Sequence, residues 1–151
     1  MGYKITNNWA LIANIYDITM KDPIVYGFVD GVQTYGNFNQ TGSQGFEIES
    51  KFLFDKFSAN INYAYYQTGG KNDVSYYAVP NNTKAMVGMP QNSIGANITY
   101  KVNADLSINS SYNLIGKRFA YNSVDSNDVS IGEFINPNHL INFYVKHTNF
   151  L

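Results

Sequence analysis

Few side chains in this sequence could carry out chemistry. The 151 residues include two histidines, His139 and His147, and no cysteine. The lack of cysteine excludes disulfides, thiolate metal sites and cysteine nucleophiles. The two histidines flank one expected strand and lie too far apart along it to bind a common ion. We therefore expect a protein that is not an enzyme and has no catalytic residues, no metal site and no cofactor.

Two expected loops carry candidate binding residues. Asp125, Asp128 and Glu133 share one loop, but their spacing is not that of a calcium-binding loop. A solvated loop is the simpler interpretation, with weak cation binding as the alternative. Tyr76 and Tyr77 lie in another loop, and exposed aromatic side chains on loops are typical recognition groups. We take this pair as the candidate ligand contacts, with packing inside the loop as the alternative.

Two basic residues, Lys117 and Arg118, lie near the expected outer end of a strand. Phosphates of lipopolysaccharide would lie at that level if the strand crossed an outer membrane. A solvated pair, or two positions kept for structural reasons, is the alternative interpretation.

The composition limits the class of protein. Charged residues make up 14% and aromatic residues 16% of the chain, and the net charge is -1. Soluble domains have about 25% charged residues, and nucleic-acid binding normally needs a basic stripe. No apolar run is long enough for a membrane helix, and no signal peptide is recognisable. An exported protein would then have lost its signal, or the chain is a piece of a longer one. A membrane β-barrel and a secreted β-sandwich both fit this composition.

The dominant pattern is an alternation of apolar and polar residues with period two, which predicts β-strands. Pro23 lacks an amide donor and predicts a break in one of them. A second irregularity is expected at the glycine pair Gly42 and Gly45. We expect about seven strands, at residues 3–6, 9–20 (resuming at 24–28), 34–54, 57–67, 92–102, 106–121 and 140–147.

The connections alternate in length. Residues 7–8, 55–56 and 103–105 are expected tight turns, because Asn and Asp tolerate the backbone conformations that such turns need. The other connections are long, at residues 68–90 and 122–138, and residues 30–33 cap two extended strands. Short turns at one end and long loops at the other are typical of an outer-membrane barrel, with periplasmic turns and extracellular loops. This asymmetry favours the barrel over the sandwich.

The charges in residues 45–54 predict which face is which. Glu47, Glu49 and Lys51 share one face of that strand. Because a lysine facing lipid at the middle of the bilayer costs about 2–4 kcal/mol, this face must line the lumen. The opposite face, which would face lipid, carries Phe46, Ile48, Phe52 and Phe54. Aromatic residues expected near strand ends, where a girdle would lie, are Trp9, Phe54, Phe57, Tyr100 and Phe119.

Seven strands do not close a barrel. An open sheet edge in hydrocarbon leaves backbone groups unpaired, and bacterial single-chain barrels have an even number of strands. We therefore expect further strands elsewhere in a larger protein. The alternative is a small barrel of eight strands, with the eighth at residues 74–79 or 129–135.

The order of several short motifs resembles the barrel of TonB-dependent outer-membrane receptors. In that family a strand enters a loop, returns through a Tyr-x-Asn segment and continues into Gly-x-Glu, and a later strand pair leads to Gly-x-Arg. The matching residues here are 9–16 (WALIANIY), 22–26 (DPIVY), 34–37 (TYGN), 45–49 (GFEIE), 79–80 (VP), 90–94 (PQNSI), 97–100 (NITY) and 116–121 (GKRFAY).

The resemblance implies an all-β fold, namely a portion of an antiparallel transmembrane β-barrel of the bacterial outer membrane. Family members close 22 strands around a plug domain and have a segment that engages TonB; neither the plug nor that segment is recognisable here. The implied partners are outer-membrane lipid, the rest of the barrel and the plug, TonB through other segments, and a nutrient ligand, with no nucleic acid. The implied function is import of a scarce nutrient such as an iron–siderophore, haem, cobalamin or a glycan. A small barrel with a structural or adhesive role and a soluble carbohydrate-binding sandwich are the alternatives.

Overall fold

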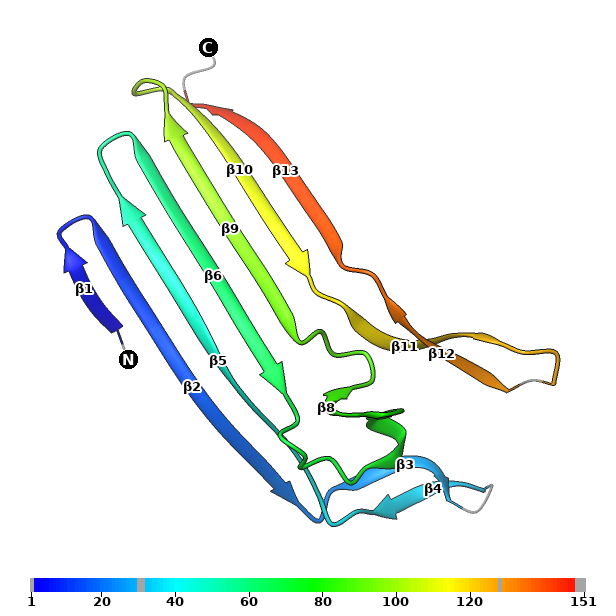
Figure 1. Ribbon diagram of the computed structural model, residues 1–151. Helices are drawn as coiled ribbons and strands as arrows, with labels where there is room; N and C mark the ends of the chain where they lie inside the picture. Colours follow the sequence, from blue (N-terminus) through cyan, green and yellow to red (C-terminus); the bar gives the residue numbers. More distant parts are fainter. Residues whose placement is uncertain (1, 30–31, 128, 149–151) are drawn as a thin grey trace.

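The computed structural model describes residues 2–29, 32–127 and 129–148. Its main element is one antiparallel sheet of seven strands in the order β1-β2-β5-β6-β9-β10-β13, which we call the wall (Figure 1). The part of the chain that the structure describes contains no helix with the length and hydropathy needed to cross a membrane. The wall strands are β1 (Gly2–Thr6), β2 (Trp9–Lys21), β5 (Gln40–Leu53), β6 (Phe57–Gln67), β9 (Asn92–Lys101), β10 (Leu106–Ile115) and β13 (Asn138–His147).

The tight turns all lie at one end of the wall, which we call the turn end (Figure 1). Side-chain amides stabilise two of them, as expected for Asn in turns. The Asn103 Oδ1 atom accepts hydrogen bonds from the backbone amides of Asp105, at 2.9 Å, and Leu106, at 2.8 Å. The Asn8 side-chain amide donates to the Leu53 carbonyl at 2.6 Å. The sequence-based prediction of three short connections at one end is therefore confirmed.

The long connections lie at the opposite end, the loop end, and they have secondary structure of their own (Figure 1). Two of them are β-hairpins. The third, residues 68–91 between β6 and β9, contains a 3-10 turn and a small ladder, and we call it the middle loop. Their elements are β3 (Ile24–Val29) with β4 (Val32–Asn37), η1 (Ser75–Tyr77) with β7 (Ala78–Val79) and β8 (Asn82–Met86), and β11 (Arg118–Val124) with β12 (Ser130–Ile135).

The break expected at Pro23 is present, and it imposes a second break on the neighbouring strand. Asp22 adopts a positive φ of 51° between β2 and β3. Its amide donates to the Asn39 carbonyl at 3.0 Å, and the Phe38 amide donates to the Pro23 carbonyl at 3.1 Å. The expected continuous strand 34–54 is therefore wrong: it is interrupted at residues 38–39 and not at the glycines Gly42 and Gly45.

The expected strand 106–121 is also divided, because β10 ends at Ile115 and β11 begins at Arg118. The cause is Gly116, whose amide donates to the Asn92 carbonyl at 2.9 Å. A Cβ atom at residue 116 would collide with that carbonyl oxygen, so the close approach requires glycine.

Neither of the two candidates for an eighth wall strand joins the wall. Residues 130–135 do form β12, but this strand pairs with β11 in a hairpin that projects beyond β10 and β13 (Figure 1). Residues 74–79 form the 3-10 turn and the two-residue strand β7. Within the described residues β1 and β13 each pair with one wall strand only, so the wall is an open sheet and not a small closed barrel.

The buried core lies at the loop end and not in the wall. Val79, Ala85 and Phe119 are buried together, and Val87 packs against them. The Phe119 ring also makes edge contacts with Tyr121 and with Phe134, at 5.4 Å between ring centroids in both cases. The packing of Phe119 with Val79 and Ala85 attaches the middle loop to the β11–β12 hairpin. The wall itself is one layer thick, so its large apolar side chains are exposed unless lipid or further protein covers them.

Candidate functional site: a two-faced wall with structured loops

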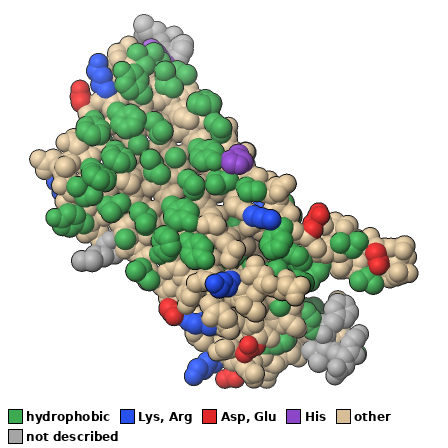
Figure 2. All heavy atoms as spheres, in the orientation of Figure 1, with side chains coloured by type: hydrophobic (Ala, Val, Ile, Leu, Met, Phe, Trp, Pro, Cys, Tyr) green, Lys and Arg blue, Asp and Glu red, His purple; other side chains and the backbone are tan. Residues whose placement is uncertain are grey.

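The strand register assigns every wall side chain to one of two faces. Residues directly opposite each other in an antiparallel pair share a face, and the pairs Phe46–Tyr65, Tyr63–Ile94 and Leu114–His139 therefore continue one face across the sheet. We call it the outward face. Among the described wall strands from β1 to β13 it carries no Asp, Glu, Lys or Arg between the two belts of aromatic residues described next. Figure 2 shows apolar side chains covering one side of the wall, with charged groups gathered at its ends.

Aromatic residues form a belt at the turn end of the outward face. Trp9 stacks on Phe52 with ring centroids 5.7 Å apart, and the Trp9 indole donates to the Ser50 hydroxyl at 2.8 Å. Phe57 lies opposite Tyr100 and contacts Phe54. These are four of the five aromatic residues expected in a girdle, Trp9, Phe54, Phe57 and Tyr100.

The fifth expected girdle residue, Phe119, does not belong to it. Only 6% of its surface is exposed, because the middle loop covers it. The prediction was wrong because strand position alone does not show which loop packs on a side chain.

A second belt lies at the loop end of the outward face, and it was not found from the sequence. Phe46 contacts Tyr63 and Tyr65 with centroid distances of 5.8 Å and 5.6 Å. The Tyr112 hydroxyl and the His139 Nδ1 atom are 2.8 Å apart and hydrogen-bonded. From Phe57 to Tyr65, strand β6 spans about 20 Å along the barrel axis at about 3.4 Å per residue and a tilt of about 40°. The distance between the two belts is therefore somewhat below the height of about 25 Å that the apolar band has in outer-membrane barrels.

The opposite face, which we call the inward face, is polar. Asn60 donates to the Glu49 carboxylate at 2.8 Å, and the Lys51 ammonium lies 3.2 Å from the same carboxylate. Further along, the Thr99 hydroxyl and the Asn109 side-chain oxygen are 2.7 Å apart. The prediction that Glu47, Glu49 and Lys51 share the lumen face agrees with this register. A face of amides, hydroxyls and paired charges is suited to contact with water or with a polar domain.

The histidines do not form a metal site. His139 lies on the outward face in contact with Tyr112, and His147 pairs with Leu106 at the turn end. Within the described residues no group of three His, Cys, Asp or Glu side chains could hold a metal ion.

The two described acidic residues of the β11–β12 hairpin, Asp125 and Glu133, accept hydrogen bonds from within the hairpin. The Asp125 carboxylate accepts hydrogen bonds from the amides of Val129, at 2.9 Å, and Asn127, at 2.8 Å. These two bonds hold the pKa of Asp125 below its ordinary value. Glu133 accepts a hydrogen bond of 2.5 Å from the Asn122 side chain. Asp128 lies outside the described residues. The Asp125 carboxylate therefore organises the tip of the β11–β12 hairpin.

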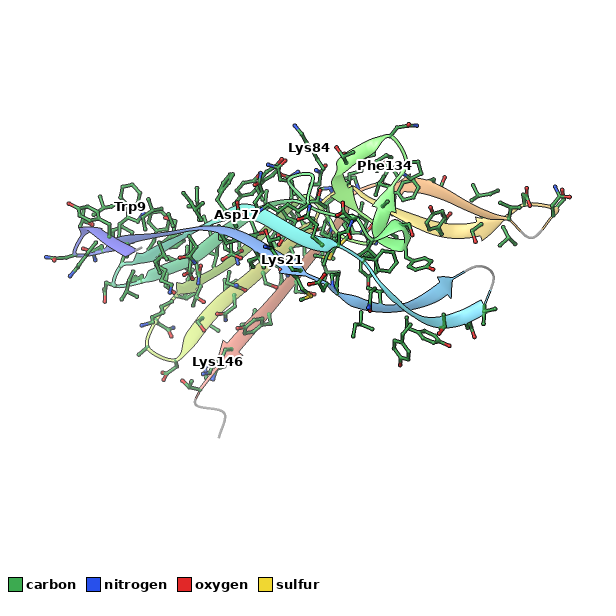
Figure 3. The ribbon with its side chains drawn as sticks, turned by 90° about the horizontal axis from the view of Figure 1, so that it is seen from below. Trp9, Asp17, Lys21, Lys84, Phe134 and Lys146 are labelled. Atoms are coloured by element: carbon green, nitrogen blue, oxygen red, sulfur yellow. The ribbon has the colours of Figure 1, made fainter. Side chains whose placement is uncertain are left out.

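The two basic residues occupy different environments. The Lys117 ammonium lies 4.8 Å from the centroid of the Phe134 ring, within the range of a cation–π contact. The Arg118 Nη1 atom is buried and makes no hydrogen bond within the described part of the chain. Figure 3 shows Phe134 and Lys84 at the loop end, and Asp17 and Lys21 towards the loop end of β2, with Trp9 at its turn end.

The candidate ligand residues, Tyr76 and Tyr77, lie on η1 in the middle loop. The Tyr76 ring makes an edge contact with Phe38, at 5.9 Å between centroids, and it occupies the space that a side chain at Gly27 would need. Tyr77 is 37% exposed. Tyr76 therefore connects the middle loop to the β3–β4 hairpin, whereas Tyr77 lines a hollow.

That hollow, which we call the loop-end pocket, has a volume of about 310 Å³. It lies between the loop-end residues of the wall and the middle loop. Its large side chains are Ile18, Met20, Tyr66, Tyr77, Met86 and Met89. The sequence does not reveal it, because the pocket joins β2 and β6 to a loop whose path depends on its contacts.

An antiparallel sheet with an apolar outward face between two aromatic belts, a polar inward face and structured loops at one end defines a segment of an outer-membrane β-barrel. The family model described as TonB dependent receptor-like, beta-barrel, matches residues 1–148. The chain therefore belongs to the TonB-dependent receptor family, and its location is the bacterial outer membrane. No functionally curated protein shows significant sequence similarity to the chain.

Solved structures of such receptors have the same fold. The FpvAI–pyocin S2 complex matches with a TM-score of 0.67 and 11% identity over 97% of this chain and 20% of that chain. The FrpB iron transporter from Neisseria meningitidis matches with a TM-score of 0.65 and 14% identity, over 97% and 23%. The ferripyoverdine receptor of the outer membrane of Pseudomonas aeruginosa matches with a TM-score of 0.65 and 11% identity, over 95% of this chain and 19% of that chain. The chain thus spans about a fifth of the length of these proteins.

Proposed function

We propose that this chain is a seven-stranded portion of the barrel of a receptor that imports a scarce nutrient, with an iron–siderophore as the first candidate. The single observation that supports this function most strongly is the two-faced wall, whose three structured loops all lie at one end. Such loops can capture a ligand outside the cell, while the polar inward face lines its route. Two of the similar structures are an iron transporter and a ferripyoverdine receptor, which favours iron carriers. Haem, cobalamin and glycans stay as alternatives.

The open edges of the wall support the proposal that other strands complete the barrel. Backbone groups of β1 and β13 that lack a neighbouring strand would each cost several kcal/mol in hydrocarbon. Outer-membrane lipid would cover the outward face, and a plug domain would contact the inward face. TonB would act through parts of the receptor other than this wall. The function is passage and capture, not catalysis.

Two observations argue against the alternative functions. The only other sheets in the described residues are two-stranded ladders of the loops, so no second sheet covers the outward face as in a sandwich. Large side chains such as Ile15, Phe143 and Val145 stay between 66% and 88% exposed, which a soluble carbohydrate-binding protein would not tolerate. The small-barrel alternative requires β1 to pair with β13, and these strands are not paired.

We propose that Tyr77 contacts the ligand and that Tyr76 holds the middle loop in place for it. The test is uptake of radiolabelled iron carriers, haem, cobalamin and glycans by cells with the intact receptor and with the gene deleted. Deletion is expected to abolish uptake of one iron carrier, and Tyr77→Ala to reduce it. Tyr3→Ala is the control, because Tyr3 is exposed on the outward face at the turn end. Unchanged uptake of all compounds after deletion would exclude the import function.

A further inference from the structure

The inward face of the wall changes character at the loop end. In the band between the aromatic belts this face carries Glu47, Glu49 and several Asn side chains. Beyond the loop-end belt the same face of β2 carries Ile18 and Met20, which pair with Ser43 and Thr41. Ile18 is 56% exposed and Met20 is 57% exposed. Because this face is directed away from lipid, membrane contact does not account for two large exposed apolar side chains.

The middle loop turns this apolar area into the loop-end pocket. Met86, Met89 and Tyr77 of the loop line it together with Ile18 and Met20 of the wall. The Tyr66 hydroxyl lies 3.5 Å from the Met86 sulfur atom and donates to it. The hollow of about 310 Å³ is close to the lower size of small-molecule sites, about 300 Å³. The wall contacts it on one side and the middle loop on the other, and it opens widely to solvent.

The chemistry of the lining selects one kind of occupant. None of the described side chains that line the pocket carries a charge. A charged group would lose water without gaining a partner, which disfavours its binding. Thioether groups and phenol rings make favourable contacts with aromatic rings. The hydroxyl groups of Thr41 and Ser43 lie at the wall side of the pocket, where they can pair with one polar substituent.

We propose that the loop-end pocket binds an uncharged aromatic group of the imported nutrient before the nutrient enters the lumen. The inference rests on the proposed import function and adds the ligand class. Lipid is not the occupant, because the pocket lies on the inward face. A charged head group is not the occupant either, because the lining offers no counter-charge. The pocket therefore recognises the organic part of a nutrient, while any charged or metal-bearing part lies outside it.

The chain contains four methionines, Met1, Met20, Met86 and Met89, and the last three line the pocket. The experiment is a titration of the intact receptor, labelled with ¹³C at methionine methyl groups, with phenol as the probe. Single changes of the three pocket methionines to leucine assign their signals. We expect saturable upfield shifts of all three signals, since an aromatic ring shields methyl groups that lie over it. Cyclohexanol, which has no ring current, and benzoate, which is charged, are expected not to produce them.

The blocking variant is Ser43→Phe, which places a ring in the pocket, and it is expected to weaken phenol binding by about tenfold or more. Ser58→Phe is the matched control, because Ser58 lies on the same inward face at the turn end. Signals that ignore phenol but respond to a soluble paramagnetic agent would overturn the proposal. Signals that respond to neither would show that another part of the receptor fills the pocket, which also overturns it.

The proposed function is tested separately by the uptake assay. Uptake that survives while phenol fails to bind would overturn the ligand class and leave the import function standing. Phenol binding in a receptor whose deletion changes no uptake would overturn the import function and leave the pocket as an aromatic-binding site.

Discussion

Replacing Ile61 with lysine tests the assignment of the two faces. Ile61 lies on the outward face of β6, midway between Phe57 of the turn-end belt and Tyr65 of the loop-end belt, and it is 41% exposed. At the middle of the bilayer a lysine on the lipid side costs about 2–4 kcal/mol. Because about 1.4 kcal/mol corresponds to a factor of ten, the ratio of folded to unfolded protein should fall by about 30-fold to 1,000-fold.

The assay is equilibrium unfolding of the intact receptor by guanidinium chloride in lipid vesicles, followed by intrinsic fluorescence. Asn62→Lys is the matched control, because Asn62 is the next residue of the same strand and lies on the inward face over Gly95. We expect Asn62→Lys to change the free energy of unfolding by less than about 1 kcal/mol. If Asn62→Lys destabilised the protein as much as Ile61→Lys, or more, the assignment of faces from the register would be refuted.

Three further changes test the loop end and the strand break. Phe119→Ala should destabilise the packing of the middle loop by about 3–5 kcal/mol and speed cleavage of that loop by protease. Phe134→Ala should have a smaller effect, because Phe134 is 42% exposed. Equal effects of the two changes would contradict the assignment of Phe119 to the loop-end core. Gly116→Ala should lower the midpoint of unfolding, since its methyl group would collide with the Asn92 carbonyl, and an unchanged midpoint would show that the wall adjusts freely there. The lowered pKa of Asp125 means that its hairpin tip is stabilised above the ordinary carboxyl pKa, 3.8, and that this stabilisation is lost as the pH falls through the lowered value. Protection of the tip amides, measured relative to the intrinsic exchange rate at each pH, should therefore fall only at acid pH, and D125N should remove this dependence.

The wall was predictable from the sequence because one physical rule governs it. A strand between lipid and a polar lumen must alternate in chemistry at every residue, so β6 was expected at residues 57–67 and occurs there. The short turns were equally accessible, since Asn103 stabilises its turn through contacts within a few residues. Local rules were sufficient for these turns, because each joins two wall strands that are neighbours in sequence.

The loop end was not predictable in the same way. Pro23 signalled a break in its own strand, but the break at Phe38 appears only when the pairing of Phe38 with Pro23 is known. The position of Phe119 along its strand predicts a girdle residue, but the middle loop covers it. The loop-end pocket is formed by residues of β2, β5, β6 and the middle loop. The spacing of residues within one segment does not predict that these four segments come together.

The alternation of outward and inward side chains has a consequence for how such genes can change. In a wall strand, inserting or deleting a single codon would exchange the two faces of the residues beyond it in that strand and place charges such as Glu47 and Glu49 in lipid. Selection should therefore remove insertions and deletions of a single residue inside strands, whereas the loops can grow or shrink freely. Natural variants of this chain should differ in loop length and keep their strand lengths, so that binding specificity can diversify on a frame whose length is held constant.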